Sequence, residues 1–180
     1  DHMGDVVNLL GSGKDFGCRF TYKVQDEAGG IAQALGLAEN FVGNDTMTVI
    51  LGDNIFEAPL KKAVDNYPGT GGQILIQKVE DPERFGVAEL EGDNIVGIEE
   101  KPETPKSEYA VTGIYMFDSD VFDLIKTLTP SGRGELEITD VNNHYIRKGT
   151  MKFSVLDGWW TDPRTQEADK LANQFAYKLE

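Results

Sequence analysis

The chain has 180 residues, of which 17 are Lys or Arg and 31 are Asp or Glu, so its formal net charge is −14. This acidity disfavours a nucleic-acid backbone or an anionic membrane as a partner, and no apolar run approaches the ~20 residues that cross a bilayer. We expect one domain of ordinary hydrophobic content over residues 1–180. The single cysteine, Cys18, permits no internal disulfide and favours a reducing, cytoplasmic compartment.

Predicted strands and helices alternate through the first half of the chain. Residues 20–24 show the apolar–polar alternation of a half-buried strand, and residues 31–42 place their apolar side chains at helical spacing. Residues 47–51 are a short apolar run that ends in Gly-Asp-Asn at 52–54, which predicts a buried strand closed by a turn. A further strand is expected at 73–79.

The second half continues the alternation and adds a hairpin. Residues 87–90 and 95–98 flank a Glu-Gly-Asp-Asn turn, which predicts two antiparallel strands. The remaining elements are expected as a strand at 110–117, a helix from 118 or 119 to 128, a helix at 137–148, a strand at 152–156 and an amphipathic helix at 168–179. Together these elements predict an α/β fold with a mixed sheet.

Two aspartates are candidate ligands for a hard cation. Asp53 lies at the carboxyl end of a predicted strand, where open α/β sheets bind ligands and where a carboxylate can hold Mg²⁺ near substrate phosphates. Taken alone, the Gly-Asp-Asn pattern favours a simple strand-end turn over a metal site at Asp53. Asp162 precedes the final predicted helix and is either a second metal ligand or a helix cap, and its position alone favours the cap.

A few polar side chains suit a phosphate or sugar ligand, which a chain this acidic can bind only through placed cations, a metal ion or backbone N–H groups. Lys101 ends the predicted hairpin and can reach a phosphate, while Glu100 can accept from sugar hydroxyls; a solvated charge cluster is the simpler alternative. Arg133 lies between two glycines on a loop before a helix, where a guanidinium can approach an anion. The amide of Gln25 can read a pyrimidine edge.

Other chemistries fit the sequence poorly. The two histidines, His2 and His144, are isolated, and there is no Gly-x-Ser-x-Gly elbow and no plausible Cys–His pair. The Gly29-Gly30 pair is by itself a weak signal of a phosphate loop.

Six sequence blocks, in this order and spacing, resemble the glucose-1-phosphate thymidylyltransferases, a group of sugar-1-phosphate nucleotidyltransferases. The blocks are residues 24–34, 49–56, 81–87, 98–102, 109–115 and 133–140. The resemblance implies a Rossmann-like nucleotide-diphospho-sugar transferase fold, with a mixed, mostly parallel sheet flanked by helices and a β-hairpin in the sugar-binding portion. It also implies that dTTP and glucose 1-phosphate react with Mg²⁺ present to give dTDP-glucose and pyrophosphate.

The resemblance assigns a role to each matching position. It implies nucleotide contacts at Gln25, Gly30 and Asp53, sugar contacts at Gly86, Glu100, Lys101 and Val111, catalytic charge at Lys101 and Arg133, and Mg²⁺ ligands at Asp53 and Asp162. Catalysis would then consist of orientation and neutralisation of developing negative charge, with no covalent enzyme intermediate.

The chain departs from the family pattern in two places. Family members open with a strand and a Gly-Gly-x-Gly-Thr-Arg-Leu-like loop that holds the triphosphate, and we expect this chain to be an N-terminally incomplete member that is impaired or inactive alone. The family has Asp-x-Gly-Thr-His where this chain has Asp-Pro-Arg-Thr-Gln from Asp162, so the match at the second metal ligand is incomplete and Pro163 restricts the Asp162 backbone. A UTP-dependent enzyme, a non-catalytic nucleotide-sugar binding remnant and homo-oligomerisation all stay open.

Overall fold

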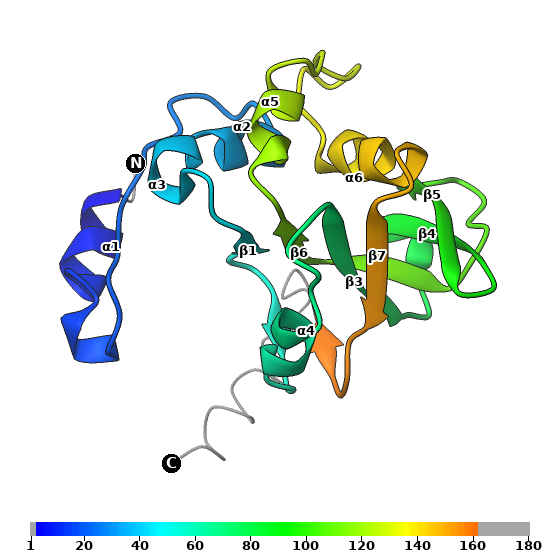
Figure 1. Cartoon of the computed structure of the whole chain (residues 1–180), viewed down its shortest axis with the longest axis horizontal. Coiled ribbons are helices and arrows are strands. Elements are labelled where there is room, and N and C mark those ends of the chain that lie inside the picture. Colours follow the sequence, from blue (N-terminus) through cyan, green and yellow to red (C-terminus); the bar gives the residue numbers. More distant parts are fainter. Residues whose placement is uncertain (1–2, 162–180) are drawn as a thin grey trace.

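A computed structural model describes residues 3–161, and its centre is a six-stranded sheet built around β6 (Tyr109–Phe117) (Figure 1). The strand order is β5-β4-β6-β3-β7, and β1 pairs with β6 beside this path. The other strands of this sheet are β1 (Met47–Ile50), β3 (Gly72–Lys78), β4 (Gly86–Glu91), β5 (Asn94–Glu100) and β7 (Met151–Val155). A separate two-stranded sheet joins β2 (Ile55–Phe56) to β8 (Trp160–Thr161).

Strand β6 is antiparallel to every strand with which it pairs, namely β1, β3 and β4. Both β1 and β3 are antiparallel to β6, and β7 is parallel to β3, so β1, β3 and β7 share one direction. The α/β class with a mixed sheet is therefore confirmed, but the expectation of a mostly parallel sheet is wrong for the described strands, where only β3 and β7 pair in parallel. Strand β6 lies between β1 and β3 and pairs with both of them. Apolar patterning shows where a strand lies but not its direction.

One edge of β6 is divided between two strands. Its C-terminal half pairs with β1, from Ile50 opposite Ile114 to Met47 opposite Phe117, whereas its N-terminal half meets β4 where Val87 lies opposite Ala110. Strands β1 and β4 therefore diverge from β6 between these two pairings. This divergence opens the sheet at the position of the candidate site.

Apolar cores lie on both faces of the sheet. Alternate residues of β6 point to opposite faces, with Tyr115 and Phe117 in one core and Ile114 and Met116 in the other. Burial on both faces explains why β6 is a nearly continuous apolar run. The first core is covered by α2 (Ile31–Gly36), α5 (Asp120–Ile125) and α6 (Ile138–Arg147), and the second is flanked by α4 (Lys61–Asp65).

Most predicted elements of the central sheet are confirmed, but the N-terminal region differs from expectation. Residues 20–24 form no strand, and Phe20 instead packs locally against Phe16 and Tyr22. The expected helix at 31–42 is interrupted, so that α2 is followed by a short α3 (Glu39–Val42). The expected helix at 118–128 forms as α5, which begins after Ser119 and ends three residues early at Ile125. Asp118 does not cap it, because its carboxylate accepts from the Gly71 N–H and the Tyr145 hydroxyl.

Several short elements were not predicted, and one expectation falls beyond the described range. The additional elements are α1 (Met3–Leu10), α4, the short strands β2 and β8, and the 3₁₀ turns η1 (Lys14–Phe16) and η2 (Pro82–Arg84). Helix α1 has no buried residue and lies apart from the sheet (Figure 1). The helix expected at 168–179 lies outside the described residues. None of the helices within residues 3–161 has the length and apolar character needed to cross a membrane.

Candidate functional site

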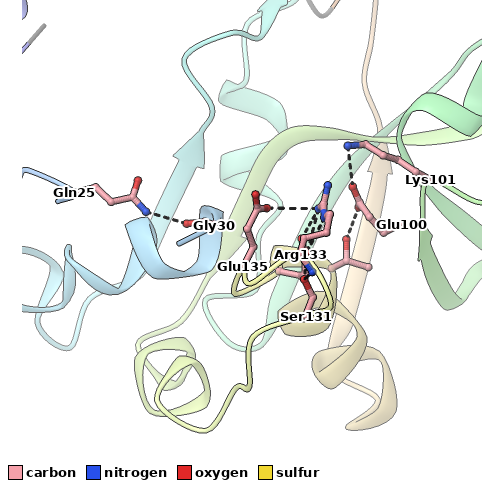
Figure 2. Close-up of polar contacts among 9 residues, drawn as sticks. Gln25, Gly30, Glu100, Lys101, Ser131, Arg133 and Glu135 are labelled. Carbon is pink, nitrogen blue, oxygen red and sulfur yellow. Dashed lines mark hydrogen bonds and ion pairs between the residues drawn. The ribbon is translucent and has the colours of Figure 1, made fainter. Parts of the chain in front are cut away.

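A cavity of about 350 Å³ lies where β1 and β4 diverge from β6. The structure brings six of the predicted site residues into its lining, namely Asp53, Gly86, Glu100, Lys101, Val111 and Arg133. They come from the end of β1, both strands of the hairpin, β6 and the loop before α6. Figure 2 shows that Glu100, Lys101 and Arg133 converge, whereas Gln25 and Gly30 lie to one side. Asp162 lies outside the described residues.

Asp53 is held in place through its neighbour Asn54. The Asn54 Nδ2 donates to Asp53 Oδ1 at 2.9 Å, while Asn54 Oδ1 accepts from the Gly113 N–H at 2.8 Å and from Trp160 Nε1 at 2.8 Å. The turn that follows β1 is thereby tied both to β6 and to β8. Sequence reasoning named Asp53 and missed Asn54 and Trp160, although Asn54 belongs to one of the six blocks.

Glu100 is the last residue of β5 and Lys101 follows it directly, and both line the cavity. Glu100 Oε2 accepts a hydrogen bond from the Thr139 hydroxyl at 2.8 Å, and Lys101 Nζ lies 3.9 Å from Glu100 Oε1. Lys101 has a φ of 47°, which makes it the single non-glycine residue with a left-handed backbone in the described part of the chain. Such a conformation costs a side-chain-bearing residue about 1–2 kcal/mol. Its backbone N–H donates to the Phe85 carbonyl at 2.9 Å, which holds this conformation.

Two carboxylates orient Arg133. Its Nη2 donates to both oxygens of Glu137, at 3.0 and 2.9 Å, and forms an ion pair with Glu135 at 3.5 Å. Partial burial of Glu137 favours its neutral form, but hydrogen bonds from Arg133 and Ser131 outweigh burial and lower the pKa of this carboxyl. Glu137 therefore stays ionised at neutral pH and restrains the guanidinium at the cavity wall.

Gln25 and Gly30 do not line the cavity. The Gln25 Nε2 donates to the Gly30 carbonyl at 3.2 Å and to Gln33 Oε1 at 2.7 Å. Gly30 has a φ of 95°, and a Cβ there would lie 2.5 Å from the Leu136 carbonyl oxygen, so only glycine fits this position. The next residue, Ile31, does border the cavity, which places this pair beside the site.

The cavity combines both signs of charge. Its lining carries Arg84, Lys101 and Arg133 together with the carboxylates Asp53, Glu100, Glu135 and Glu137. Burial, reinforced by the charges of Glu100 and Asp53, raises the pKa of Tyr115 in the same lining, so that this phenol stays neutral. Because three cations face four carboxylates, a phosphate ligand would gain from an additional cation.

No group of three or more His, Cys, Asp or Glu side chains among residues 3–161 is arranged to hold a metal ion. Magnesium, however, is commonly bound by one or two carboxylates together with substrate phosphates and water. Asp53 fits the role of one such carboxylate, because it borders the cavity and its hydrogen bond from Asn54 fixes the orientation of its side chain.

Comparison with known proteins identifies the family. The profile of the nucleotidyl transferase family matches residues 2–168. The glucose-1-phosphate thymidylyltransferase of Neisseria gonorrhoeae is 43% identical over 96% of this chain and 62% of its own length, and that of Mycolicibacterium smegmatis is 41% identical over 96% and 62%. The chain thus spans a little under two thirds of the length of these relatives.

Solved structures share the fold. A Bacillus anthracis protein described as a candidate glucose-1-phosphate thymidylyltransferase in complex with sucrose is 58% identical, with a TM-score of 0.91 over 97% of this chain and 72% of that one. A UDP-glucose pyrophosphorylase complexed with UDP-glucose is 25% identical, with a TM-score of 0.81 over 98% and 74%. The resemblance of the six sequence blocks and the nucleotidyltransferase fold are confirmed, and the chain belongs to the nucleotidyl transferase family.

Proposed function

We propose that this chain forms the sugar-phosphate side of an enzyme that transfers a thymidylyl group from dTTP to glucose 1-phosphate, giving dTDP-glucose and pyrophosphate. The observation that carries the proposal is the convergence of Glu100, Lys101 and Arg133 on one cavity. Two cations beside a hydroxyl-accepting carboxylate suit a ligand that has a phosphate at one end and hydroxyls at the other. The names of the relatives support the same substrates.

Different residues of the cavity bind the sugar and the phosphate of glucose 1-phosphate. Glu100 accepts from a glucose hydroxyl, and Gly86 and Val111 offer backbone groups on the adjoining strands β4 and β6. Lys101 and Arg133 hold the sugar phosphate. One of its oxygens then forms a bond to the α-phosphorus of dTTP, the bond from that phosphorus to the bridging oxygen breaks, and pyrophosphate leaves with that electron pair. The phosphate is already an anionic nucleophile, so the step needs no protein base.

On the nucleotide side, Asp53 would act near the phosphates of dTTP. Gln25 and Gly30, which lie beside the cavity, would contact the base. Mg²⁺, bound by Asp53 and by Asp162 beyond the described residues, would neutralise charge on the reacting phosphates. Asn54 and its contacts to Gly113 and Trp160 would keep the Asp53 carboxylate in place for that ion.

A UTP-dependent reaction is the second candidate, because a UDP-glucose pyrophosphorylase shares the fold at a TM-score of 0.81. Its identity of 25% is lower than the 43% shared with a thymidylyltransferase. We therefore favour dTTP. In both reactions the glucose 1-phosphate would bind to the same residues.

Ligand binding and turnover test the proposal. Trp160 borders the cavity, so its fluorescence should report titration with glucose 1-phosphate and dTDP-glucose, and Trp160→Phe identifies the signal. Lys101→Ala should weaken glucose 1-phosphate binding at least tenfold, while Lys106→Ala, which removes a nearby lysine paired with Glu89, should not. Equal affinity in wild type and Lys101→Ala would contradict the proposed phosphate site.

Turnover separates an enzyme from a binding remnant. Pyrophosphate release from dTTP or UTP is measured with a segment that carries the family's Gly-Gly-x-Gly-Thr-Arg-Leu-like loop fused before residue 1. The proposal predicts release that needs glucose 1-phosphate and is faster with dTTP. Faster release with UTP would favour the second candidate, and binding without release by the fused protein would favour a non-catalytic role.

A further inference from the structure

We propose that Asn142 is a further sugar-recognition residue, whose side-chain amide oxygen accepts a hydrogen bond from a hydroxyl of the hexose phosphate in the cavity. The inference rests on the proposed function, because it concerns the same ligand and the same cavity. It adds to that function a contact which the six sequence blocks did not indicate.

The first argument is a buried polar atom without a partner. Two buried side-chain atoms of the described residues, Asn142 Oδ1 and Thr150 Oγ1, have no hydrogen-bond partner within that part of the chain. Asn142 is 1% exposed and borders the cavity, whereas Thr150 does not. Burying an amide oxygen without a donor is unfavourable, and an occupant of the adjoining cavity can provide that donor.

The second argument is the contrast with the following residue. Asn143 uses its amide on the backbone of β5, where Nδ2 donates to the Ile98 carbonyl at 2.8 Å and Oδ1 accepts from the Ile98 N–H at 2.9 Å. Asn143 therefore fastens α6 to the hairpin. The amide oxygen of Asn142 accepts no hydrogen bond from the described residues, although Asn142 is the more deeply buried of the two.

The third argument is position. Asn142 follows Thr139 by one turn of α6, so both side chains lie on the same helix face, and both border the cavity. Thr139 donates to Glu100, the carboxylate proposed to accept from a sugar hydroxyl. Asn142 would supply a second acceptor on this side of the cavity, which suits a hexose with several hydroxyl donors. The broad χ2 torsion of asparagine lets the amide turn toward such a ligand.

The first experiment compares two variants that each remove an unpartnered buried atom. Asn142→Leu and Thr150→Val should both raise the melting temperature of the ligand-free protein by a few degrees, about 3 °C, because each deletes an unsatisfied polar group. Only Asn142→Leu should weaken glucose 1-phosphate binding, by about tenfold. A purely structural role for Asn142 predicts a lower melting temperature and unchanged affinity. Asn142→Ala provides a smaller substitution should the leucine perturb the fold.

The second experiment identifies the hydroxyl. The monodeoxy analogues of glucose 1-phosphate are titrated against wild type and Asn142→Leu. One analogue should bind wild type about tenfold more weakly than glucose 1-phosphate, and the variant should no longer distinguish the two. If wild type binds glucose 1-phosphate and the variant binds within twofold, or if both proteins rank all analogues alike, the inference alone is overturned. If wild type binds no sugar phosphate, the proposed function fails and the inference fails with it.

Discussion

Asn54 and Gly113 approach so closely that a side chain on residue 113 would lie where the Asn54 amide now lies. A Cβ at 113 would be 2.2 Å from Asn54 Nδ2, while the Gly113 N–H donates to Asn54 Oδ1 at 2.8 Å. Gly113→Ala should therefore displace Asn54 and Asp53, destabilise the protein by about 1–3 kcal/mol and weaken ligand binding. Gly132→Ala is the matched control, because a Cβ at 132 meets nothing within 4 Å. Denaturant unfolding that shows equal stability for both variants would contradict this packing.

The contact between Glu137 and Arg133 should make stability depend on pH. Because the folded-state pKa of Glu137 is lowered, its contribution is present above the unfolded pKa, near 4.5, and is lost as pH falls through the folded value. Glu137→Gln should be less stable than wild type by about 1 kcal/mol at pH 7, with the difference narrowing below pH 4.5. Glu135→Gln, which alters only the 3.5 Å contact, should change stability less. Urea unfolding across this pH range checks the sign, and a difference that grew toward acid would contradict it.

The left-handed backbone of Lys101 allows its strain and its charge to be separated. Lys101→Gly should gain about 1 kcal/mol of unfolding free energy over Lys101→Ala, because glycine adopts a φ of 47° without a Cβ penalty. Both variants lose the ammonium, so both should bind glucose 1-phosphate weakly. Calorimetric titration and thermal unfolding measure the two effects. A glycine variant that recovers phosphate affinity would show that backbone shape, and not charge, matters at this position.

Asp53 should couple Mg²⁺ to nucleotide-sugar binding. In wild type, Mg²⁺ should tighten dTDP-glucose binding, whereas in Asp53→Asn that gain should fall to within about twofold of the metal-free value, since a neutral amide is a poor Mg²⁺ ligand. Asp157→Asn, which alters an exposed carboxylate paired with Lys62 at 3.4 Å, is the control. Titrations with and without Mg²⁺ supply the comparison. An undiminished Mg²⁺ effect in Asp53→Asn would remove Asp53 from the metal site.

Local patterning predicted the strands of the central sheet because each carries a strong apolar signature. Residues 110–117 illustrate this, since burial on both faces leaves β6 almost without polar positions. The same patterning failed at 20–24, where alternation is present but no partner strand lies beside the segment among the described residues. It also could not show that β6 runs antiparallel between β1 and β3, because strand direction is a property of the pairing.

The sequence likewise indicated some residues of the candidate site and not others. Glu100, Lys101 and Arg133 were indicated by sequence blocks, and the structure brings them into one cavity. Asn54 lies in one of the blocks but was given no role, and Asn142 lies outside them, because the role of each depends on contacts with other segments of the folded chain. The closeness of Asn54 to Gly113 and Trp160, which follow it by 59 and 106 residues, is visible only in the folded chain.

A crystal structure of the protein with glucose 1-phosphate and Mg²⁺ tests the central claim most directly. The account predicts that the phosphate lies within hydrogen-bonding distance, about 2.7–3.2 Å, of Lys101 Nζ and the Arg133 guanidinium. The glucose ring should contact Glu100 within the cavity between β4 and β6. A sugar phosphate bound elsewhere, or bound in this cavity with its phosphate turned away from both Lys101 and Arg133, would contradict it.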